Sequence, residues 1–346
     1  MKRRAEGFRA VDYLAFSAAK LLTLAVCVSV GSVSVPIGDT LRLLASAVSG
    51  ASAPSVAVSP AVILSVRLPR VLCVALTGAS LSLCGCAMQG LLRNPLADGS
   101  TLGVSSGASL GAVVAIAFGF TLPAAPFAGT MLAAMLFAFL SIVAILALAY
   151  RLDRTLATNT IILIGVIFSM FASSLMSVVI TFASDKVKQI TFWTMGSLSG
   201  SSYENALALA VALVLFGGAL LMHASELNAF AIGEDNARHV GVNVRRVKLL
   251  TLVAVSGLIG VCVSIGGSIG FVGLVTPHIL RMLVGPNHKR LLPASMFGGA
   301  IFLMLCDLAA RTLLSPRELP IGFITSLIGA ALFVYIFDRS RRKGRA

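Results

Sequence analysis

Long apolar runs, each ended by charged or turn residues, recur along this chain of 346 residues. A helix of about 20 apolar residues crosses the hydrocarbon core of a bilayer. Apolar residues make up 58% of the chain and charged residues only 12%, whereas an ordinary soluble domain has about 25% charged residues. Such a chain cannot cover a water-soluble globule with polar surface. The runs therefore predict an all-α membrane protein.

Ten runs fill the chain and leave no room for a large soluble domain. The expected transmembrane helices cover residues 15–34, 62–86, 99–119, 124–150, 159–182, 201–222, 247–266, 270–284, 292–313 and 320–338. We expect one transmembrane domain over residues 1–346, whose longest cytoplasmic loop covers residues 223–246. The apolar stretch after the basic start recurs many times, so the sequence does not favour a cleaved signal peptide.

The basic residues orient the chain. A net charge of +14 would suit nucleic acid if it formed a patch, but Lys and Arg stand at the ends of the apolar runs. With both termini in the cytoplasm, 20 of the 27 basic residues lie on the cytoplasmic side, as the positive-inside rule requires. The other seven are Arg42, Arg67, Arg70, Lys186, Lys188, Arg311 and Arg317. We expect cytoplasmic termini, contact with membrane lipid and no nucleic-acid partner.

Small residues mark where helices pack closely. Gly103, Gly107 and Gly111 recur every four residues, the spacing that lets two helix backbones approach. The glycine-rich stretch 266–273 interrupts helical propensity and predicts a tight turn that is buried in protein. Six cysteines all lie in apolar runs, and we expect them to be buried thiols rather than metal ligands.

Ionisable side chains are scarce inside the expected spans, although such side chains usually mark function there. Asp307 lies within a span, and Arg311 follows one helical turn later, which favours a structural salt bridge. The chain shows no series of Asp, Glu or His that could relay protons across the membrane. It lacks a phosphate-binding loop, a metal-site motif and a nucleophile motif. The sequence thus predicts no catalytic residue, metal site or bound cofactor in this chain.

Four hydroxyl side chains lie near one face of the expected helix 159–182, namely Ser169, Ser173, Ser177 and Thr181. We call them the hydroxyl stripe, and two interpretations of it stand. Ser and Thr are ordinary residues at helix interfaces in membranes, where they hydrogen-bond across helices. Alternatively, the stripe forms a weakly polar wall along which a bulky, chelated or mostly non-ionic solute slides.

The cytoplasmic loop contains a short charged segment, Ile232–Gly241. Its acidic residues come first and its basic residues last, an order that complements a helix dipole, and a glycine stands at the expected left-handed end. A two-turn surface helix is expected, either as an inert connector or as a knob that fits a cleft in a cytoplasmic partner. The residues that would form the knob are Gly233, Glu234, Asp235, Arg238, His239 and Gly241.

Five blocks of residues stand out in order along the chain. The first joins Arg67-Leu68-Pro69-Arg70, Gly78-Ala79-Ser80-Leu81 and Gly85-Cys86-Ala87-Met88-Gln89, and the others are Arg93-Asn94-Pro95-Leu96-Ala97-Asp98, Leu102-Gly103-Val104-Ser105-Ser106-Gly107-Ala108, Gly270-Phe271-Val272-Gly273-Leu274-Val275-Thr276-Pro277-His278-Ile279-Leu280-Arg281 and Glu318-Leu319-Pro320-Ile321-Gly322. Together they resemble the permease family of bacterial ABC importers for ferric siderophores, haem and cobalamin. One departure is Gly99-Ser100, where many members of that family have a proline.

The resemblance implies a type II ABC importer permease fold with ten transmembrane helices in the bacterial inner membrane. It implies a second permease subunit, identical or paralogous, two cytoplasmic ATPase subunits that bind ATP and Mg, and an extracytoplasmic substrate-binding protein. The expected function is ATP-driven import of an iron chelate, with a ferric siderophore favoured and haem or cobalamin as alternatives. A secondary transporter driven by an ion gradient is the rival of another class, and a purely structural membrane protein is a third.

Three groups of residues match functional positions of that family. Arg67, Arg70 and Arg311 correspond to arginines that receive acidic residues of the binding protein. We expect a basic landing site outside the membrane in which Arg67 and Arg70 are unpaired, whereas Arg311 is divided between Asp307 and the binding protein. The charged segment of the cytoplasmic loop corresponds to the coupling helices that seat in the ATPase. Thr158 and Asn159 correspond to a cytoplasmic gate at the entrance to the fifth span.

Overall fold

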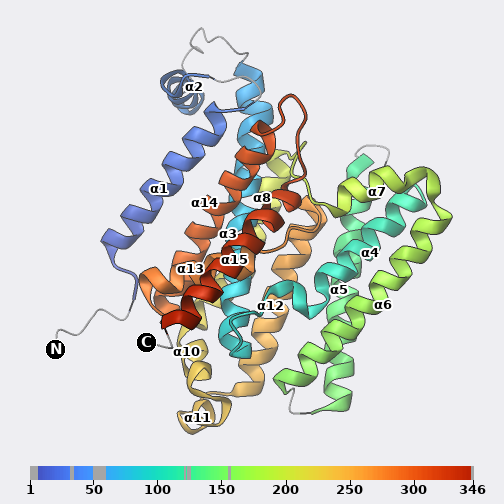
Figure 1. The fold of residues 1–346 in the computed structure, drawn as a ribbon, viewed down its shortest axis with the longest axis vertical. Coiled ribbons are helices and arrows are strands. Elements are labelled where there is room, and N and C mark those ends of the chain that lie inside the picture. Colours follow the sequence, from blue (N-terminus) through green and yellow to red (C-terminus); the bar gives the residue numbers. More distant parts are fainter. Residues whose placement is uncertain are drawn as a thin grey trace.

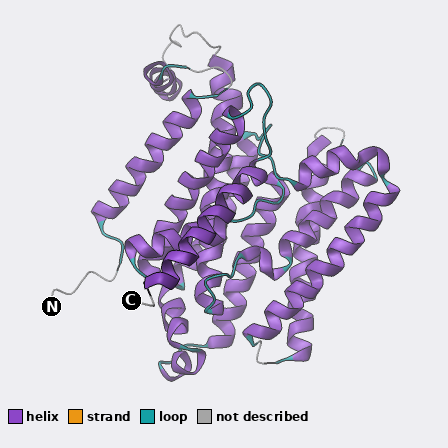
Figure 2. Ribbon diagram, in the orientation of Figure 1, coloured by secondary structure: helices purple, strands orange, loops and turns teal. Residues whose placement is uncertain are grey.

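The structure is a computed structural model, and it describes residues 7–31, 35–49, 60–120, 122, 126–154 and 157–343. Two margins of the expected spans, residues 32–34 and 124–125, lie outside the described residues, as do the basic residues Lys2, Arg3, Arg4 and Arg345. The described chain consists of helices joined by loops (Figure 2).

The helices follow one another along the chain as a bundle (Figure 1). They are α1 (Ala10–Ser29), α2 (Ile37–Ser49), α3 (Leu68–Leu92) preceded by a π-helical segment (Val62–Arg67), α4 (Val104–Ala117), α5 (Pro126–Leu152), α6 (Thr158–Phe182), α7 (Val187–Thr194), α8 (Tyr203–Ala212) continuing through a π-helical segment (Leu213–Gly217) into α9 (Gly218–Met222), α10 (Ala224–Ile232), α11 (Glu234–His239), α12 (Val244–Gly266), α13 (Val272–Val284), α14 (His288–Thr312) and α15 (Ile321–Lys343).

Ten apolar helical segments match the ten expected runs one for one. Within the described residues, seven segments are long and apolar enough to cross a membrane, and three shorter apolar helices accompany them, at Val104–Ala117, Val272–Val284 and Ile321–Tyr335. Helix α1 begins at Ala10, before the first residue of the expected run 15–34. Asp12 accepts a hydrogen bond from the backbone of Arg9 and so fixes this earlier start.

Helix α3 lies at the centre of the bundle and packs against α12, α13 and α14 (Figure 1). Its glycines make these contacts close. A Cβ atom on Gly78 would overlap the carbonyl oxygen of Gly299 in α14, and one on Gly85 would overlap that of Gly273 in α13. Backbones therefore meet directly at these two crossings, as small residues allow in membrane helices.

The expected glycine stripe packs helices together, as predicted. A Cβ atom on Gly107 would lie 2.5 Å from Cβ of Ser141, and one on Gly111 would lie 2.5 Å from the carbonyl oxygen of Ala133, both in α5. Gly103 precedes α4 in a left-handed conformation (φ +79) and faces the backbone of Gly165 in α6. The stripe thus joins α4 to its two neighbours.

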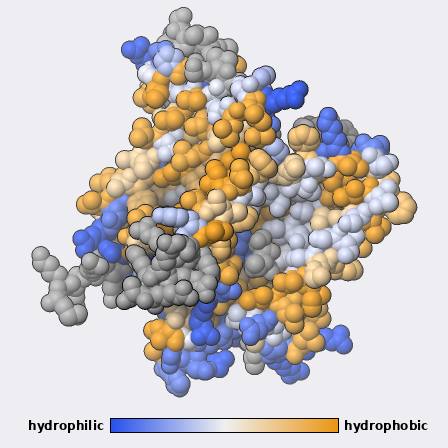
Figure 3. All heavy atoms as spheres, in the orientation of Figure 1, coloured by the Kyte–Doolittle hydropathy of each residue, from blue (hydrophilic) through white to orange (hydrophobic). Residues whose placement is uncertain are grey.

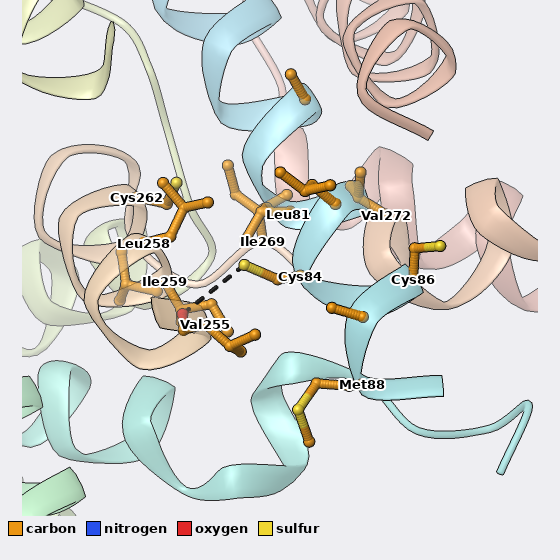
Figure 4. Close-up of a cluster of buried hydrophobic side chains, with 14 of the residues drawn as sticks. Leu81, Cys84, Cys86, Met88, Val255, Leu258, Ile259, Cys262, Ile269 and Val272 are labelled. Carbon is orange, nitrogen blue, oxygen red and sulfur yellow. Dashed lines mark hydrogen bonds between the residues drawn. The ribbon is translucent and has the colours of Figure 1, made fainter. Parts of the chain in front are cut away.

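Buried thiols and aliphatic side chains fill the contact between α3 and α12 (Figure 4). Cys84 lies among Val255, Leu258 and Ile259, and its thiol donates to the carbonyl oxygen of Val255 at 3.7 Å. All six cysteines are buried and unbridged, which confirms the prediction from their apolar surroundings.

The glycine-rich stretch between α12 and α13 forms the predicted turn. Gly267 and Phe271 both have positive φ angles, +68 and +67, and residues 267–271 lie outside any helix.

On the outside of the molecule, apolar surface predominates along the bundle, and hydrophilic atoms gather around its lower end in Figure 3. This distribution is the one that a bilayer-spanning bundle needs.

Candidate functional site

The carboxylate of Asp307, near the end of α14, binds two arginines at once. Its Oδ1 atom accepts from Arg70 Nε at 3.1 Å and lies 3.0 Å from Arg70 Nη2, while its Oδ2 atom accepts from Arg311 Nε at 2.8 Å. The side chains of Asp307 and Arg311 are only 1% and 5% exposed. The expected Asp307–Arg311 salt bridge is therefore confirmed, and it forms in a dry setting where an unpaired charge would be strongly destabilising.

Two of the expected docking arginines hold the end of α1. Arg67 donates from Nη1 to the carbonyl oxygens of Val28 and Ser29, both at 3.2 Å. Arg311 donates to the carbonyl oxygens of Cys27 at 2.9 Å and Val30 at 3.1 Å. The last carbonyls of a helix lack partners within it and carry its negative dipole end, so guanidinium groups suit them well.

Arg70 has a second partner, Glu318, whose Oε2 atom lies 2.8 Å from Arg70 Nη1. The Arg70 side chain is 11% exposed and that of Glu318 is 45% exposed. The expectation that Arg67 and Arg70 are unpaired was thus wrong, because the last carbonyl oxygens of α1 bind Arg67 and the carboxylates of Asp307 and Glu318 bind Arg70. The docking role of Arg67, Arg70 and Arg311 itself stays a prediction.

At the opposite end of the bundle, the expected surface helix of the cytoplasmic loop forms as α11. Its first turn holds Glu234 and Asp235, its last turn holds Arg238 and His239, and this order matches the helix dipole. Gly241 follows with a φ of +87, and its N–H donates to the carbonyl oxygen of Arg238 at 2.9 Å. The predicted glycine end of this helix is confirmed.

Glu234 links three helices at this end. Its Oε1 atom accepts from the hydroxyl of Thr158, at the start of α6, at 3.2 Å. The same atom lies 2.6 Å from Nζ of Lys248 in α12, whose side chain is 1% exposed. An expected gate residue and an expected coupling residue therefore touch. We call Thr158, Glu234 and Lys248 the coupling triad.

A hollow of about 430 Å³ opens beside the coupling triad. Its lining consists of Leu92, Arg93, Ala157, Thr158, Asn159 and Glu234. Both expected gate residues thus line one hollow together with the first residue of α11. Arg93 ends α3 in a left-handed conformation (φ 50), which turns the chain toward this hollow.

Sequence reasoning missed the role of Lys248, which it counted only as a cytoplasmic charge. A signal exists in the sequence. Lys248 stands four residues after Val244 and four before Leu252, both fully or nearly buried, so helical periodicity places its amine on the buried face of α12. A lysine in register with buried apolar residues requires an acidic partner.

The hydroxyl stripe lies on α6 as expected. Ser169 bonds the carbonyl oxygen of Gly165, Ser177 that of Ser173, and Thr181 that of Ser177, at 2.9 to 3.1 Å. Ser173, Ser177 and Thr181 are exposed. The hydroxyls of Ser169, Ser177 and Thr181 bond their own helix, and the stripe makes no hydrogen bond to another helix within the part of the chain that the structure describes. Its role as a path for substrate stays a prediction.

Comparisons with known proteins cover nearly the whole chain. The sequence model of the FecCD transport family matches residues 19–339. The uncharacterized ABC transporter permease protein YvrB of Bacillus subtilis is 41% identical, with 92% of this chain and 91% of that protein covered. The hemin transport system permease protein HmuU of Yersinia pestis is 39% identical, with 81% and 84% covered. Further relatives are named for cobalamin and molybdate import.

Among solved structures, an inward-facing conformation assigned to a metal-chelate type ABC transporter is similar to this chain. It is 33% identical with a TM-score of 0.81, and the alignment covers 94% of this chain and 98% of that one.

Proposed function

This chain belongs to the FecCD transport family of ABC transporter permeases, and we propose that it forms the membrane path of an ATP-driven importer for a ferric chelate. The coupling triad is the observation that carries the proposal. Because Glu234 of α11 binds both Thr158 of α6 and Lys248 of α12, a displacement of α11 would also move α6, the helix that carries the hydroxyl stripe.

The proposed transporter contains a second permease, identical or paralogous, two ATPase subunits and an extracytoplasmic binding protein. ATP and Mg belong to the ATPase subunits. Exposed Asp235, Arg238 and His239 on α11 supply the polar surface that an ATPase cleft would contact. The beginning of α1 and the end of α15 lie toward the same end as α11 (Figure 1), which supports cytoplasmic termini in an inner membrane.

We propose a ferric siderophore as the substrate, with haem and cobalamin as alternatives of similar bulk. The exposed hydroxyls of α6 offer weak polar contacts without charge, which suits a metal that is wrapped in an organic chelator. The relatives named for hemin, cobalamin and molybdate differ widely in the size of what they carry. Substrate choice therefore needs a direct test.

The test uses the permease reconstituted in liposomes with its ATPase and its cognate binding protein. ATP hydrolysis and uptake are measured with ferric siderophores, haem, cobalamin and molybdate in turn, and the empty binding protein is the control. We expect a ferric siderophore to stimulate both activities. Stimulation by haem, cobalamin or molybdate alone would contradict the proposed siderophore substrate but would still support an ATP-driven importer. If no loaded binding protein stimulated hydrolysis, the importer proposal would be wrong.

A further inference from the structure

An arginine and a tyrosine meet where two neighbouring helices reach one end of the bundle. Helix α5 packs against α12, and Lys248 of α12 binds Glu234 of α11, so this end of α12 is the end that holds α11 (Figure 1). Here the guanidinium carbon of Arg245, in α12, lies 4.9 Å from the centroid of the ring of Tyr150, in α5. This distance is typical of a cation–π interaction.

The guanidinium of Arg245 keeps its capacity for hydrogen bonds. Arg245 is exposed, and among the described residues its side chain forms no ion pair and donates no hydrogen bond. The contact with Tyr150 is electrostatic and uses none of the five N–H donors of the guanidinium. The ring therefore holds in place a cation whose donors are available to a ligand. A guanidinium fork matches the oxygen atoms of a phosphate group.

Both residues stand at the boundary of the hydrocarbon core. Helix α5 carries no charged side chain over residues 126–150, and Arg151 follows at once. Helix α12 carries none over residues 249–266, and Arg245 stands four residues before that stretch. Uncharged stretches of such length cross the core, and tyrosines are enriched at its edge, beside the headgroups. Arg245 thus lies at the depth where a bilayer presents phosphate.

A groove of about 260 Å³ opens beside this pair. Its lining consists of Leu146, Tyr150, Arg245 and Leu249. Each leucine lies one helical turn from the polar residue of its own helix, on the side of the membrane centre. Leu249 is 43% exposed, and Val253, one turn deeper on α12, is 44% exposed. The groove therefore combines a cation at the membrane boundary with accessible apolar surface further in.

The surroundings of the groove are basic. Three further exposed arginines stand beside the pair in the sequence, Arg151 and Arg154 at the end of α5 and Arg246 on α12. None of the three forms an ion pair with a carboxylate among the described residues. Asp153, which stands between the first two, instead accepts hydrogen bonds from the backbone and a hydroxyl at the start of α6. Such clusters at the cytoplasmic end of membrane helices attract anionic lipids.

We propose that this groove binds an anionic phospholipid of the cytoplasmic leaflet. The guanidinium of Arg245 donates to the phosphate, and an acyl chain lies along Leu249 and Val253. An acidic soluble partner would match the charge but would leave the deeper apolar surface uncovered. A phospholipid meets both, because its phosphate and its acyl chains are covalently joined. Of the proposed function, the inference uses only the cytoplasmic position of α11, which assigns the leaflet.

The test measures lipid binding to the purified full chain in detergent by native mass spectrometry. Phosphatidylglycerol and phosphatidylcholine are compared for the unaltered protein and for Arg245→Gln, Arg245→Lys and Tyr150→Leu. We expect the preference for phosphatidylglycerol to fall about fivefold in Arg245→Gln. It should also fall, by about two- to fivefold, in the two variants that keep the net charge, because a lysine lacks the guanidinium fork and a leucine does not hold the guanidinium.

Two matched controls should keep the preference for phosphatidylglycerol. Tyr150→Phe retains the ring that contacts the guanidinium. Tyr335→Leu removes a tyrosine of α15 that is likewise exposed, with an exposed fraction of 61% against 41% for Tyr150. If Arg245→Gln did not fold, Arg245→Lys and Tyr150→Leu would decide, since they leave the charge of the chain unaltered.

Four outcomes would overturn the proposal. Equal binding of the two lipids to the unaltered protein is the first. An unchanged preference in both Arg245→Lys and Tyr150→Leu would indicate a general attraction to the basic surface. Displacement of the lipid by millimolar inorganic phosphate would indicate a site for soluble anions. A weaker complex of Arg245→Gln with the ATPase subunits, at an unchanged lipid preference, would assign the arginine to the ATPase.

The lipid measurements need neither ATPase nor substrate. A failure of the lipid proposal would therefore leave the proposed importer untouched, and a failure of ATP-driven uptake would leave the lipid site untouched.

Discussion

The carboxylate of Asp307 neutralises two guanidinium groups where α1, α3 and α14 meet. Arg70 and Arg311 use it as their shared anion, and Arg311 also holds the end of α1. Removal of this one charge leaves two cations in a dry cluster. Buried ion pairs tolerate the loss of one partner poorly, although their net contribution to stability is small.

The first prediction concerns Asp307→Asn. We expect a loss of about 3–5 kcal/mol in stability, because the amide keeps the shape of the carboxylate but not its charge. Thermal unfolding of the purified protein in detergent measures this loss. Asp185→Asn, at an exposed position after α6, is the control and should unfold at the original temperature. Equal stability of Asp307→Asn and its parent would contradict the ion-pair interpretation.

A second prediction concerns the docking role of Arg70. Glu318 is the exposed partner that an acidic residue of the binding protein would replace. Glu318→Gln should therefore release Arg70 and tighten docking by about two- to fivefold, as measured by the affinity of the binding protein for the permease in nanodiscs. Weaker docking in this variant would show that Glu318, and not Arg70, meets the partner.

At the scale of elements, helix α11 is tied to α6 and α12 through the carboxylate of Glu234, while Ala237 on its inner face is buried. Asp235 beside this glutamate is 87% exposed, whereas Glu234 is held by α6 and α12. The loop is therefore connected to the spans by side-chain contacts as well as by the covalent backbone. Two neighbouring acidic residues should then differ in function.

We expect Glu234→Gln to lower the substrate moved per ATP about tenfold, because the amide cannot hold Lys248 as an ion pair, whereas the exposed surface of α11 proposed to contact the ATPase is unchanged. Asp235→Asn is the matched control and should leave this ratio unchanged. Uptake and ATP hydrolysis in the same liposomes provide both numbers. An equal effect of the two substitutions would assign the role to α11 as a surface rather than to the triad.

The crossing of α3 and α14 gives a prediction about packing. Gly78→Ala should destabilise the protein by about 1–3 kcal/mol, because the new methyl group overlaps the backbone of Gly299 in α14. Gly218→Ala is the control, since a Cβ atom there meets nothing within 4 Å, and it should be neutral or stabilising. Unfolding in detergent compares the two. Equal effects would mean that α3 and α14 can separate at no cost.

At the scale of the whole molecule, charges lie at the ends of the bundle and apolar surface lies between them. Asp307 and its arginines stand at one end, and the coupling triad stands at the other. Between the two, the described spans hold no series of acidic or histidine side chains like those that relay protons in ion-driven transporters. In the proposed importer, the driving force arrives through α11.

The prediction at this scale concerns energy supply. Uptake in cells should stop when ATP is depleted and should continue when an uncoupler collapses the ion gradients while ATP is kept constant. Radiolabelled substrate uptake under the two conditions measures this. Uptake that survives ATP depletion and stops with the uncoupler would favour the secondary transporter over the ABC importer.

Periodicity and composition determined the ten apolar segments, the glycine stripe of α4, the buried cysteines and the form of α11. Each of these features depends on residues that are close in sequence, or on the burial of apolar side chains away from water. Both dependences are visible in the order of residues along the chain. The resemblance indicated which residues of the sequence are expected to form the gate, the coupling helix and the docking site. It did not indicate how their side chains are paired.

Only the tertiary structure decided those pairings. Arg67, Arg70 and Arg311 are engaged because α1 ends beside α3 and α14, residues far apart in the sequence. Glu234 meets Thr158 and Lys248 for the same reason. A charge in a dry, apolar surrounding takes whichever opposite charge or carbonyl the fold brings near. The sequence thus supplied the ionisable groups, and helix packing chose their partners.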